Sequence, residues 1–314
     1  MEMRGNNMNK IVIIGCGNVG MSYAYALLNQ KVNIDSLVLI DVDNNKADGE
    51  VMDLNHTLPY SPNSMSIKRG DYKDCNDADI IMISAGANQE PKETRLDLIN
   101  KNDIIFKNII DEVMKTKFKG IFLIATNPVD AMSYITYKYS KLDANKVIGT
   151  GTSLDTARLR YLLSKKFSIN PKNVHAYVMG EHGDSEFIAW STASIGTIAI
   201  KDSLSEEEKE KIAIEVRDSA YDIISKKGNT SYGIGACLVR ITNAILNNEN
   251  AIITVSTYDI ENDVYISIPC VINKDGIKER LKINLETEEK ELLANSTKVI
   301  KDTIKKSIYG GKHE

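Results

Sequence analysis

The stretch Ile11-Val12-Ile13-Ile14-Gly15-Cys16-Gly17-Asn18-Val19-Gly20 decides the fold of this chain. Its first four apolar residues predict a buried strand, and residues 19–29 predict an amphipathic helix directly after the glycines. The glycines follow the spacing G-x-G-x-x-G. At such a junction Gly15 permits a tight turn, and Gly20 lets the helix pack closely on the strand. The chain therefore begins with a strand, a glycine turn and a helix, which is the first unit of a βαβ series.

The same turn has the features of a dinucleotide-binding site. Gly17 lets a pyrophosphate approach the backbone, and the N–H groups at the start of the helix, at Asn18 and Val19, can bind its oxygens. Asp41 lies 21 residues after Gly20, at the end of the second predicted strand. A carboxylate there binds the ribose hydroxyls of NAD and repels the 2′-phosphate of NADP. A glycine turn without a ligand and an ordinary strand-end aspartate fit this spacing less well, so we expect NAD as the cofactor.

The remaining chain shows two different patterns. In the first half, apolar runs at 37–40, 80–83, 121–124 and 147–148 predict parallel strands, with helices such as 96–117 between them. This predicts an α/β fold in which residues 1–149 form a doubly wound (Rossmann) parallel sheet that binds the dinucleotide. In the second half, helices are expected at 153–167, 203–226 and 285–308, and strands at 251–258, 264–272 and 277–285. Residues 150–314 are therefore expected to form an α+β substrate domain.

Charge and composition disfavour several classes of protein. The formal net charge is −4 and there is no basic block, so we expect no nucleic-acid partner. No apolar run reaches 18 residues and the polar N-terminus lacks a signal core, so we expect a cytoplasmic protein without a membrane span. The four cysteines are too scattered for a disulfide framework or a zinc site, and no metal is expected. We interpret them as small buried apolar residues: Cys16, Cys75, Cys237 and Cys270.

Five polar side chains are candidates for chemistry. His182 lies in Gly180-Glu181-His182-Gly183, and histidine is the side chain best suited to proton transfer near neutral pH; a structural histidine is the alternative. Asp155 and Arg158 share one face of a predicted helix, where a surface ion pair is the simpler interpretation. Arg95, in a polar stretch that could close as a lid, and Asn127 follow the third and fourth of the predicted strands named above and lie at the sheet edge where α/β proteins bind ligands. A solvated loop and a turn are the alternatives for these two.

Several ordered segments resemble the lactate/malate dehydrogenase family, and within it the bacterial enzymes that act on lactate. The resemblance extends from residue 11 to about residue 308, and the combination of GEHGDS with SLDTAR is highly specific. It rests on GCGNVG (15–20), GEVMDLNH (49–56), SAGANQEPKETRLDL (84–98), ATNPVD (125–130), GTGTSLDTARLRYLL (149–163), VHAYVMGEHGDSE (174–186) and VYISIPCVINKDGI (264–277). It implies an NAD-dependent oxidoreductase that transfers a hydride reversibly between NADH and pyruvate, giving L-lactate; malate or another 2-hydroxy acid is the alternative.

The resemblance also implies a role for each candidate residue. His182 resembles the family's proton donor and acceptor, and Asp155 resembles its carboxylate partner. Arg158 resembles the residue that binds the substrate carboxylate, for which a planar guanidinium is suited. Arg95 resembles a lid arginine that polarises the substrate carbonyl, and Asn127 is implied to contact both substrate and nicotinamide.

Two further positions concern the choice of substrate. The resemblance implies that Thr230 lines the substrate pocket. Family members that act on malate carry Arg at the position of Gln89, because their substrate has a second carboxylate. A neutral Gln89 leaves that carboxylate without a counter-charge, which favours pyruvate over oxaloacetate. An incidental loop glutamine is the alternative.

The resemblance further implies regulation and assembly. Arg160 and His175 match positions that bind fructose 1,6-bisphosphate in the regulated bacterial enzymes, and a two-fold interface would place two copies of each around the ligand. An exposed arginine and a structural histidine are the alternative. A homotetramer is expected. A nucleotide-binding or structural protein that has the fold without the catalysis is the remaining alternative, and the candidate residues together speak against it.

Overall fold

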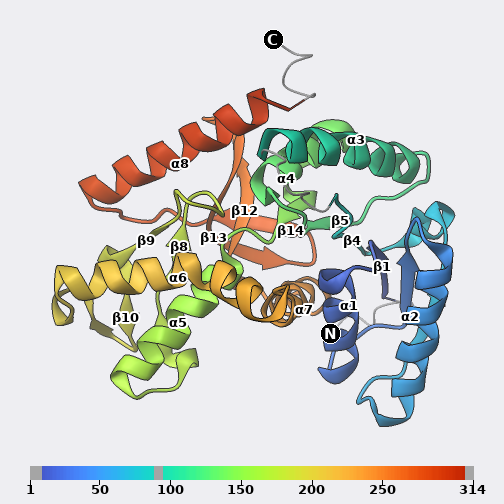
Figure 1. Cartoon of the computed structure of the whole chain (residues 1–314), viewed down its shortest axis with the longest axis horizontal. Coiled ribbons are helices and arrows are strands. Elements are labelled where there is room, and N and C mark those ends of the chain that lie inside the picture. The colour runs from blue at the N-terminus through green and yellow to red at the C-terminus, as the bar shows by residue number, and fades with distance from the viewer. Residues whose placement is uncertain (1–8, 88–94, 308–314) are drawn as a thin grey trace.

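The structure, a computed structural model, describes residues 9–87 and 95–307 (Figure 1). The helices are α1 (Asn18–Asn29), α2 (Asn44–Thr57), α3 (Arg95–Met114), α4 (Val129–Ser140), α5 (Ser153–Phe167), α6 (Glu206–Lys227), α7 (Tyr232–Leu246) and α8 (Thr287–Lys305). The main-sheet strands are β1 (Lys10–Ile14), β2 (Ser36–Ile40), β3 (Ser66–Arg69), β4 (Ile80–Ile83), β5 (Ile121–Ile124), β6 (Val147–Gly149), β12 (Ala251–Asp259), β13 (Val264–Asn273) and β14 (Gly276–Arg280). Shorter strands are β7 (Val174–His175), β8 (Val178–Met179), β9 (Phe187–Ile188), β10 (Ser194–Ile195) and β11 (Ile198–Ala199).

Within the described part of the chain, nine strands form one sheet in the order β14-β13-β12-β6-β5-β4-β1-β2-β3. All neighbours from β3 to β6 are parallel, and their order is that of a doubly wound fold, which confirms the predicted α/β class. The winding reverses between β1 and β4. The carboxyl ends of these two strands therefore form the switch point at which such sheets bind ligands.

The second half of the chain extends this same sheet. Ser256 in β12 pairs antiparallel with Gly149 in β6, and β13 and β14 follow as further antiparallel strands. A Cβ atom on Gly151, whose φ is +49°, would lie 2.6 Å from the backbone N of Ser256. The glycines at 149 and 151 therefore let β12 approach the end of β6, and the two halves share a sheet, which the sequence patterns do not indicate.

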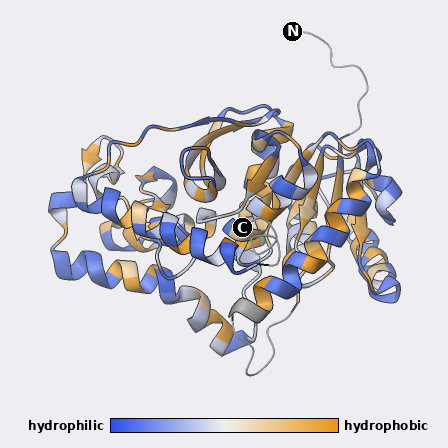
Figure 2. Cartoon of the chain, turned by 90° about the horizontal axis from the view of Figure 1, so that it is seen from above, coloured by the Kyte–Doolittle hydropathy of each residue, from blue (hydrophilic) through white to orange (hydrophobic). Residues whose placement is uncertain are grey.

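Alternate residues of the parallel strands pack on opposite faces of the sheet. Ile11 and Ile13 belong to the apolar cluster that includes α1, α2 and α7, whereas Val12 and Ile14 belong to the cluster that includes α3, α4 and α8. Figure 2 shows the resulting pattern, with hydrophobic strands between helices that are hydrophilic on part of their surface. The continuous apolar runs in the sequence thus reflect strands that are buried on both faces.

The two halves also meet through helices. α1 crosses α7, where the phenol oxygen of Tyr23 lies 2.5 Å from the hydroxyl oxygen of Thr242. A Cβ atom on Gly235 would lie 2.8 Å from the carbonyl oxygen of Ser22, so the crossing is close. A separate apolar cluster joins α5 and α6 to the short strands. None of the described helices is both long enough and apolar enough to cross a membrane.

Most predicted elements are present, and the differences lie at their ends. The α5 bounds are those predicted, whereas the long charged helix begins at 206 and the last helix at 287. Capping boxes set both starts, through Ser205 with Glu208 and Glu286 with Glu289. The strand expected to extend to residue 285 ends at Arg280, and α2, α4 and α7 had no specific prediction.

Candidate active site

The glycine turn lies at the switch point of the sheet. Gly15 has a φ of +104°, and a Cβ atom on it would lie 2.5 Å from the backbone N of Ala85, just beyond β4. A Cβ atom on Gly20 would lie 2.1 Å from the carbonyl oxygen of Gly15. The tight turn and the close packing of helix on strand that the sequence predicted are therefore both present.

The same turn fits the phosphates of a dinucleotide. Space is open around Gly17, where an added Cβ atom would meet nothing within 4 Å. Gly17 is the N-cap of α1, and no side chain caps this helix, so its first N–H groups can serve a ligand. Asp41 lies beside the turn, where its carboxylate accepts a hydrogen bond of 2.6 Å from the Cys16 N–H. These residues fit NAD as the sequence predicted.

A buried amide connects this edge to the turn after β5. Asn102 in α3 is 1% exposed. Its side-chain oxygen accepts from the Ala87 N–H at 2.8 Å, and its amide nitrogen donates to the Asn127 carbonyl at 2.9 Å. The Asn127 side chain itself is exposed, and the Asn127–Pro128 peptide is cis. Asn102 thus holds the loops that follow β4 and β5, and no distinctive motif marks this role in the sequence.

His182, Asp155 and Arg158 form one hydrogen-bonded group. Nδ1 of His182 lies 2.7 Å from Oδ2 of Asp155, and Nη1 of Arg158 donates to Oδ1 of the same carboxylate at 2.6 Å. The Asp155 side chain is 2% exposed and that of Arg158 is 11% exposed, whereas 26% of the His182 side chain remains exposed. The surface ion pair that spacing alone favoured is therefore wrong, because the helix face that carries both residues is buried against residues 180–186 between β8 and β9, the histidine loop.

The charges in this group favour a protonated histidine. Burial alone would lower the pKa of His182, but the Asp155 carboxylate outweighs it and raises that pKa to about 9. Burial alone would raise the pKa of Asp155, whereas the His182 and Arg158 charges lower it. The arrangement can therefore hold an imidazolium over a buried carboxylate near neutral pH, with part of the ring open to a ligand.

Two further carboxyl groups belong to this site, and the sequence analysis missed both. A carboxylate oxygen of Glu186 lies within 4.8 Å of a carboxylate oxygen of Asp155 and of a ring nitrogen of His182. Burial and the negative charge of Asp155 raise the pKa of Glu186 to about 8. Asp130, at the start of α4, accepts a hydrogen bond from the His182 backbone N–H at 2.8 Å. Glu186 and Asp130 are the last residues of VHAYVMGEHGDSE and ATNPVD, two of the segments that carry the family resemblance. Membership of these segments was the only sequence feature that could have identified them.

The other predicted residues are placed less directly. Arg95 begins α3, and its side chain lies outside the described part, as does the whole of Gln89. Thr230 is half-buried in the loop before α7, and α7 packs on the start of α5, where a Cβ atom on Gly233 would lie 2.7 Å from Leu154. The Arg160 Nε–H donates at 3.4 Å to the carbonyl of Ala176, the residue after His175.

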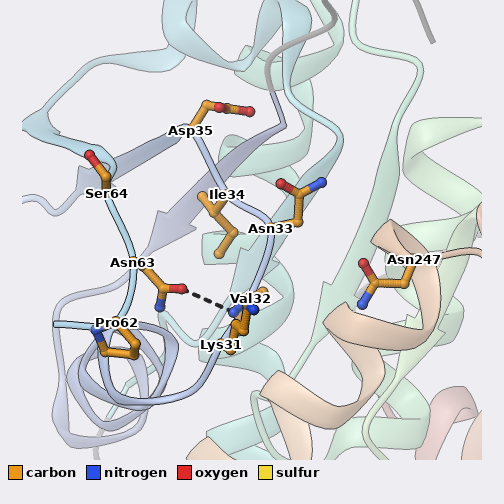
Figure 3. A pocket seen from close by; sticks show the side chains of 9 residues that line it. All are labelled: Lys31, Val32, Asn33, Ile34, Asp35, Pro62, Asn63, Ser64 and Asn247. Atoms are coloured by element: carbon orange, nitrogen blue, oxygen red, sulfur yellow. Dashed lines mark hydrogen bonds between the residues drawn. The ribbon is translucent and has the colours of Figure 1, made fainter. Parts of the chain in front are cut away.

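Two hollows lie on the surface of the described chain, and only the second borders predicted site residues. One lies before β2 and is drawn in Figure 3, where the Asn63 side chain accepts from the Val32 N–H at 3.2 Å. Since it lies at the amino end of β2, it is at the opposite edge of the sheet from Gly15. The other lies between α1 and the loop before α7, where Asn18 lines it together with Asn229 and Ser231, the chain neighbours of Thr230.

The comparisons with known proteins agree with this geometry. Residues 9–149 match the model of the NAD-binding domain of lactate/malate dehydrogenase, and residues 152–309 match that of its alpha/beta C-terminal domain. The chain belongs to the lactate/malate dehydrogenase family. It is an NAD-dependent dehydrogenase of this family, as the sequence resemblance implied.

Relatives in this family are similar over nearly their full length. An L-lactate dehydrogenase from Geobacillus sp. (strain WCH70) is 53% identical, covering 96% of this chain and 98% of the relative. A solved lactate dehydrogenase from a Medee basin deep-sea metagenome library is 49% identical with a TM-score of 0.92, covering 96% of this chain and 99% of that one. A solved minor L-lactate dehydrogenase from Enterococcus mundtii is 40% identical with a TM-score of 0.93, covering 95% and 98%.

Proposed function

We propose that this family member catalyses the reversible reduction of pyruvate to L-lactate with NADH. The observation that carries this proposal is the buried Asp155 carboxylate, which contacts both the ring of His182 and the guanidinium of Arg158. It places a proton donor and a carboxylate-binding group side by side, as a 2-oxo acid requires. The names of the similar proteins support the same activity.

The protein's own groups would act on the substrate carbonyl and carboxylate. Bound NADH supplies the hydride for the substrate C2. Arg158 binds the substrate carboxylate by two parallel hydrogen bonds. With Nδ1 of His182 on Asp155, Nε2 of the protonated ring donates a proton to the carbonyl oxygen, and the neutral ring takes a proton from lactate in reverse. Asp155 fixes the tautomer and stabilises the charged ring.

Three further residues are assigned by the family resemblance, and Asp41 by its spacing from the glycine turn. Arg95 would polarise the substrate carbonyl as the polar stretch before it closes and excludes water. Asn127 would contact substrate and nicotinamide, and its place beside Asn102 supports this assignment. Thr230 would line the pocket. Asp41 would bind the ribose hydroxyls, and its contact with the Cys16 N–H supports a position beside the dinucleotide.

The choice between pyruvate and oxaloacetate can be measured directly. Because a neutral Gln89 leaves a second carboxylate unpaired, we expect kcat/KM to be about 100-fold higher with pyruvate, as several kcal/mol of lost pairing would give. NADH absorbance assays with the two keto acids measure this ratio. Gln89→Arg should move the preference toward oxaloacetate. An unchanged ratio in that variant would exclude the role of Gln89, and a wild-type preference for oxaloacetate would favour a malate dehydrogenase.

Activation by fructose 1,6-bisphosphate is a further part of the proposal. Arg160 lies beside the strand of His175, which is exposed, and its guanidinium is 5.4 Å from the Tyr177 ring centroid. In a cytoplasmic homotetramer, a two-fold axis would bring two such pairs around one bisphosphate. The bisphosphate should lower the KM for pyruvate in the wild type and not in Arg160→Ala. Coincident saturation curves for the wild type would exclude this effector, and light scattering measures the assembly.

A further inference from the structure

The histidine loop is held from a second side by a buried carboxylate that has no assigned role. Asp130 is 3% exposed and lies in the first turn of α4. Its Oδ2 accepts from the His182 backbone N–H at 2.8 Å, and its Oδ1 accepts from the Ser256 hydroxyl at 2.5 Å. Ser256 is fully buried in β12. One carboxylate therefore joins α4, the histidine loop and β12.

This contact fixes the backbone of the loop at His182 itself. Gly180, two residues before the histidine, exchanges two hydrogen bonds of 3.0 Å with Ser267 in β13. Gly180 has a φ of +96°, so the chain turns sharply there. Asp130 then fixes the backbone at His182, and Asp155 fixes the ring. The two carboxylates together determine where the ring lies.

Asp130 also acts on the charge of the ring. Its negative charge is among the causes that raise the pKa of His182, after Asp155 and Glu186. Burial raises the pKa of Asp130 itself to about 6, although the hydrogen bonds from Ser256 and from the His182 N–H lower it. The charged groups that act on His182 or Asp130 are Asp155 in α5, Asp130 itself in α4, and Glu181 and Glu186 in the histidine loop. Arg158 in α5 and Arg217 in α6 act in turn on Glu186.

We propose that Asp130 is a positioning residue for the proton-transfer histidine, which it holds by its backbone. This inference rests on the proposed function. The α4 start also follows directly on Asn127 and Pro128, so the turn assigned to substrate and nicotinamide and the proton donor are held by one short segment.

Substitution of Asp130 separates its hydrogen bonds from its charge. In Asp130→Asn, the amide oxygen can accept from the His182 N–H and the amide nitrogen can donate to Ser256 Oγ, so the loop is kept but the charge is lost. Asp130→Ala leaves the His182 N–H and the buried Ser256 hydroxyl without this acceptor. We expect kcat for pyruvate to fall roughly 30-fold in Asp130→Ala and only about threefold in Asp130→Asn, with the Kd for NADH unchanged in both.

Ser256→Ala is the matched control, because it removes the other hydrogen bond of the same carboxylate and leaves the His182 contact. It should lower kcat less than Asp130→Ala does at an equal loss of thermal stability. If kcat in all three variants followed Tm alone, Asp130 would be a merely structural residue and the proposal would be overturned.

A titration of the His182 ring by NMR tests the inference without turnover. His182→Asn identifies the ring signal by its loss from the four histidines. Asp130→Asn should lower the ring pKa by roughly half a unit, since a nearby negative charge is removed. An unchanged ring pKa together with wild-type kcat in Asp130→Ala would overturn the proposal. If the wild type did not reduce pyruvate while the ring pKa still responded, the proposed function would fail, and only the influence of Asp130 on the His182 ring would stand.

Discussion

The glycine turn and the histidine site differ in how they are assembled. The turn consists of six consecutive residues, Gly15 to Gly20, and its function depends on backbone atoms and on missing Cβ atoms. The histidine site gathers side chains from α4, α5 and the loop after β8. The glycine turn tolerates an added side chain only where space is open. The histidine site instead depends on charges and hydrogen bonds between segments that are distant in the sequence. The following predictions test this difference.

The largest effect is expected in the histidine site. His182→Asn removes the proton donor and should lower kcat for pyruvate reduction by about 1,000-fold, within the usual range for a general acid. The Kd for NADH should remain unchanged, because the glycine turn is separate. Stopped-flow turnover and fluorescence titration of NADH measure the two quantities. Near-normal turnover in this variant would exclude His182 as the proton donor.

Two alanine substitutions in the glycine turn should affect different properties, one the binding of NADH and the other the stability of the fold. Gly17→Ala places its Cβ in open space, so Tm should stay constant while the Kd for NADH rises about tenfold, because the Cβ occupies the approach of the pyrophosphate. Gly20→Ala collides with the carbonyl of Gly15 and should cost about 2 kcal/mol of unfolding free energy. Calorimetry and NADH titration compare them. A loss of stability in Gly17→Ala equal to that in Gly20→Ala would contradict this distinction.

A smaller effect is expected from pH. Pyruvate reduction needs the protonated ring of His182 and should decline as pH rises through about 9, whereas lactate oxidation should increase over the same range. Profiles of kcat/KM in both directions measure this, with apparent values that belong to the coupled groups of the site. Asp155→Asn should move the decline to lower pH. A decline that stays at the same pH would show that Asp155 does not set the charge of the ring.

The same shift predicts a stability change. Because the pKa of His182 rises from 6.5 to about 9 on folding, its contribution to stability is complete below pH 6.5 and is lost as pH rises through 9. Burial raises the pKa of Glu186 to about 8, so this group also favours folding at lower pH. Urea titrations across this range should show less decline in His182→Asn than in the wild type.

Sequence alone predicted the strand, glycine turn and helix at residues 11–29, the further parallel strands and the position of Asp41. These features are local, since strand burial and backbone freedom are encoded in consecutive residues. For His182, Asp155 and Arg158, the residue types and spacing only named candidates; the specific roles came from the resemblance to a family. The spacing of Asp155 and Arg158 even favoured an exposed pair, because it cannot tell which face of a helix is buried.

Only the tertiary structure joined β12 to β6, and with it Ser256, Asp130 and His182 to one another. These contacts span 126 and 52 residues of chain, and no local pattern specifies them. They arise because the last three strands of the main sheet extend the parallel sheet at Gly149 and so place β12 against the start of α4. The sequence thus determined where a dinucleotide fits, whereas packing of the distant segments decided how the histidine is held and charged.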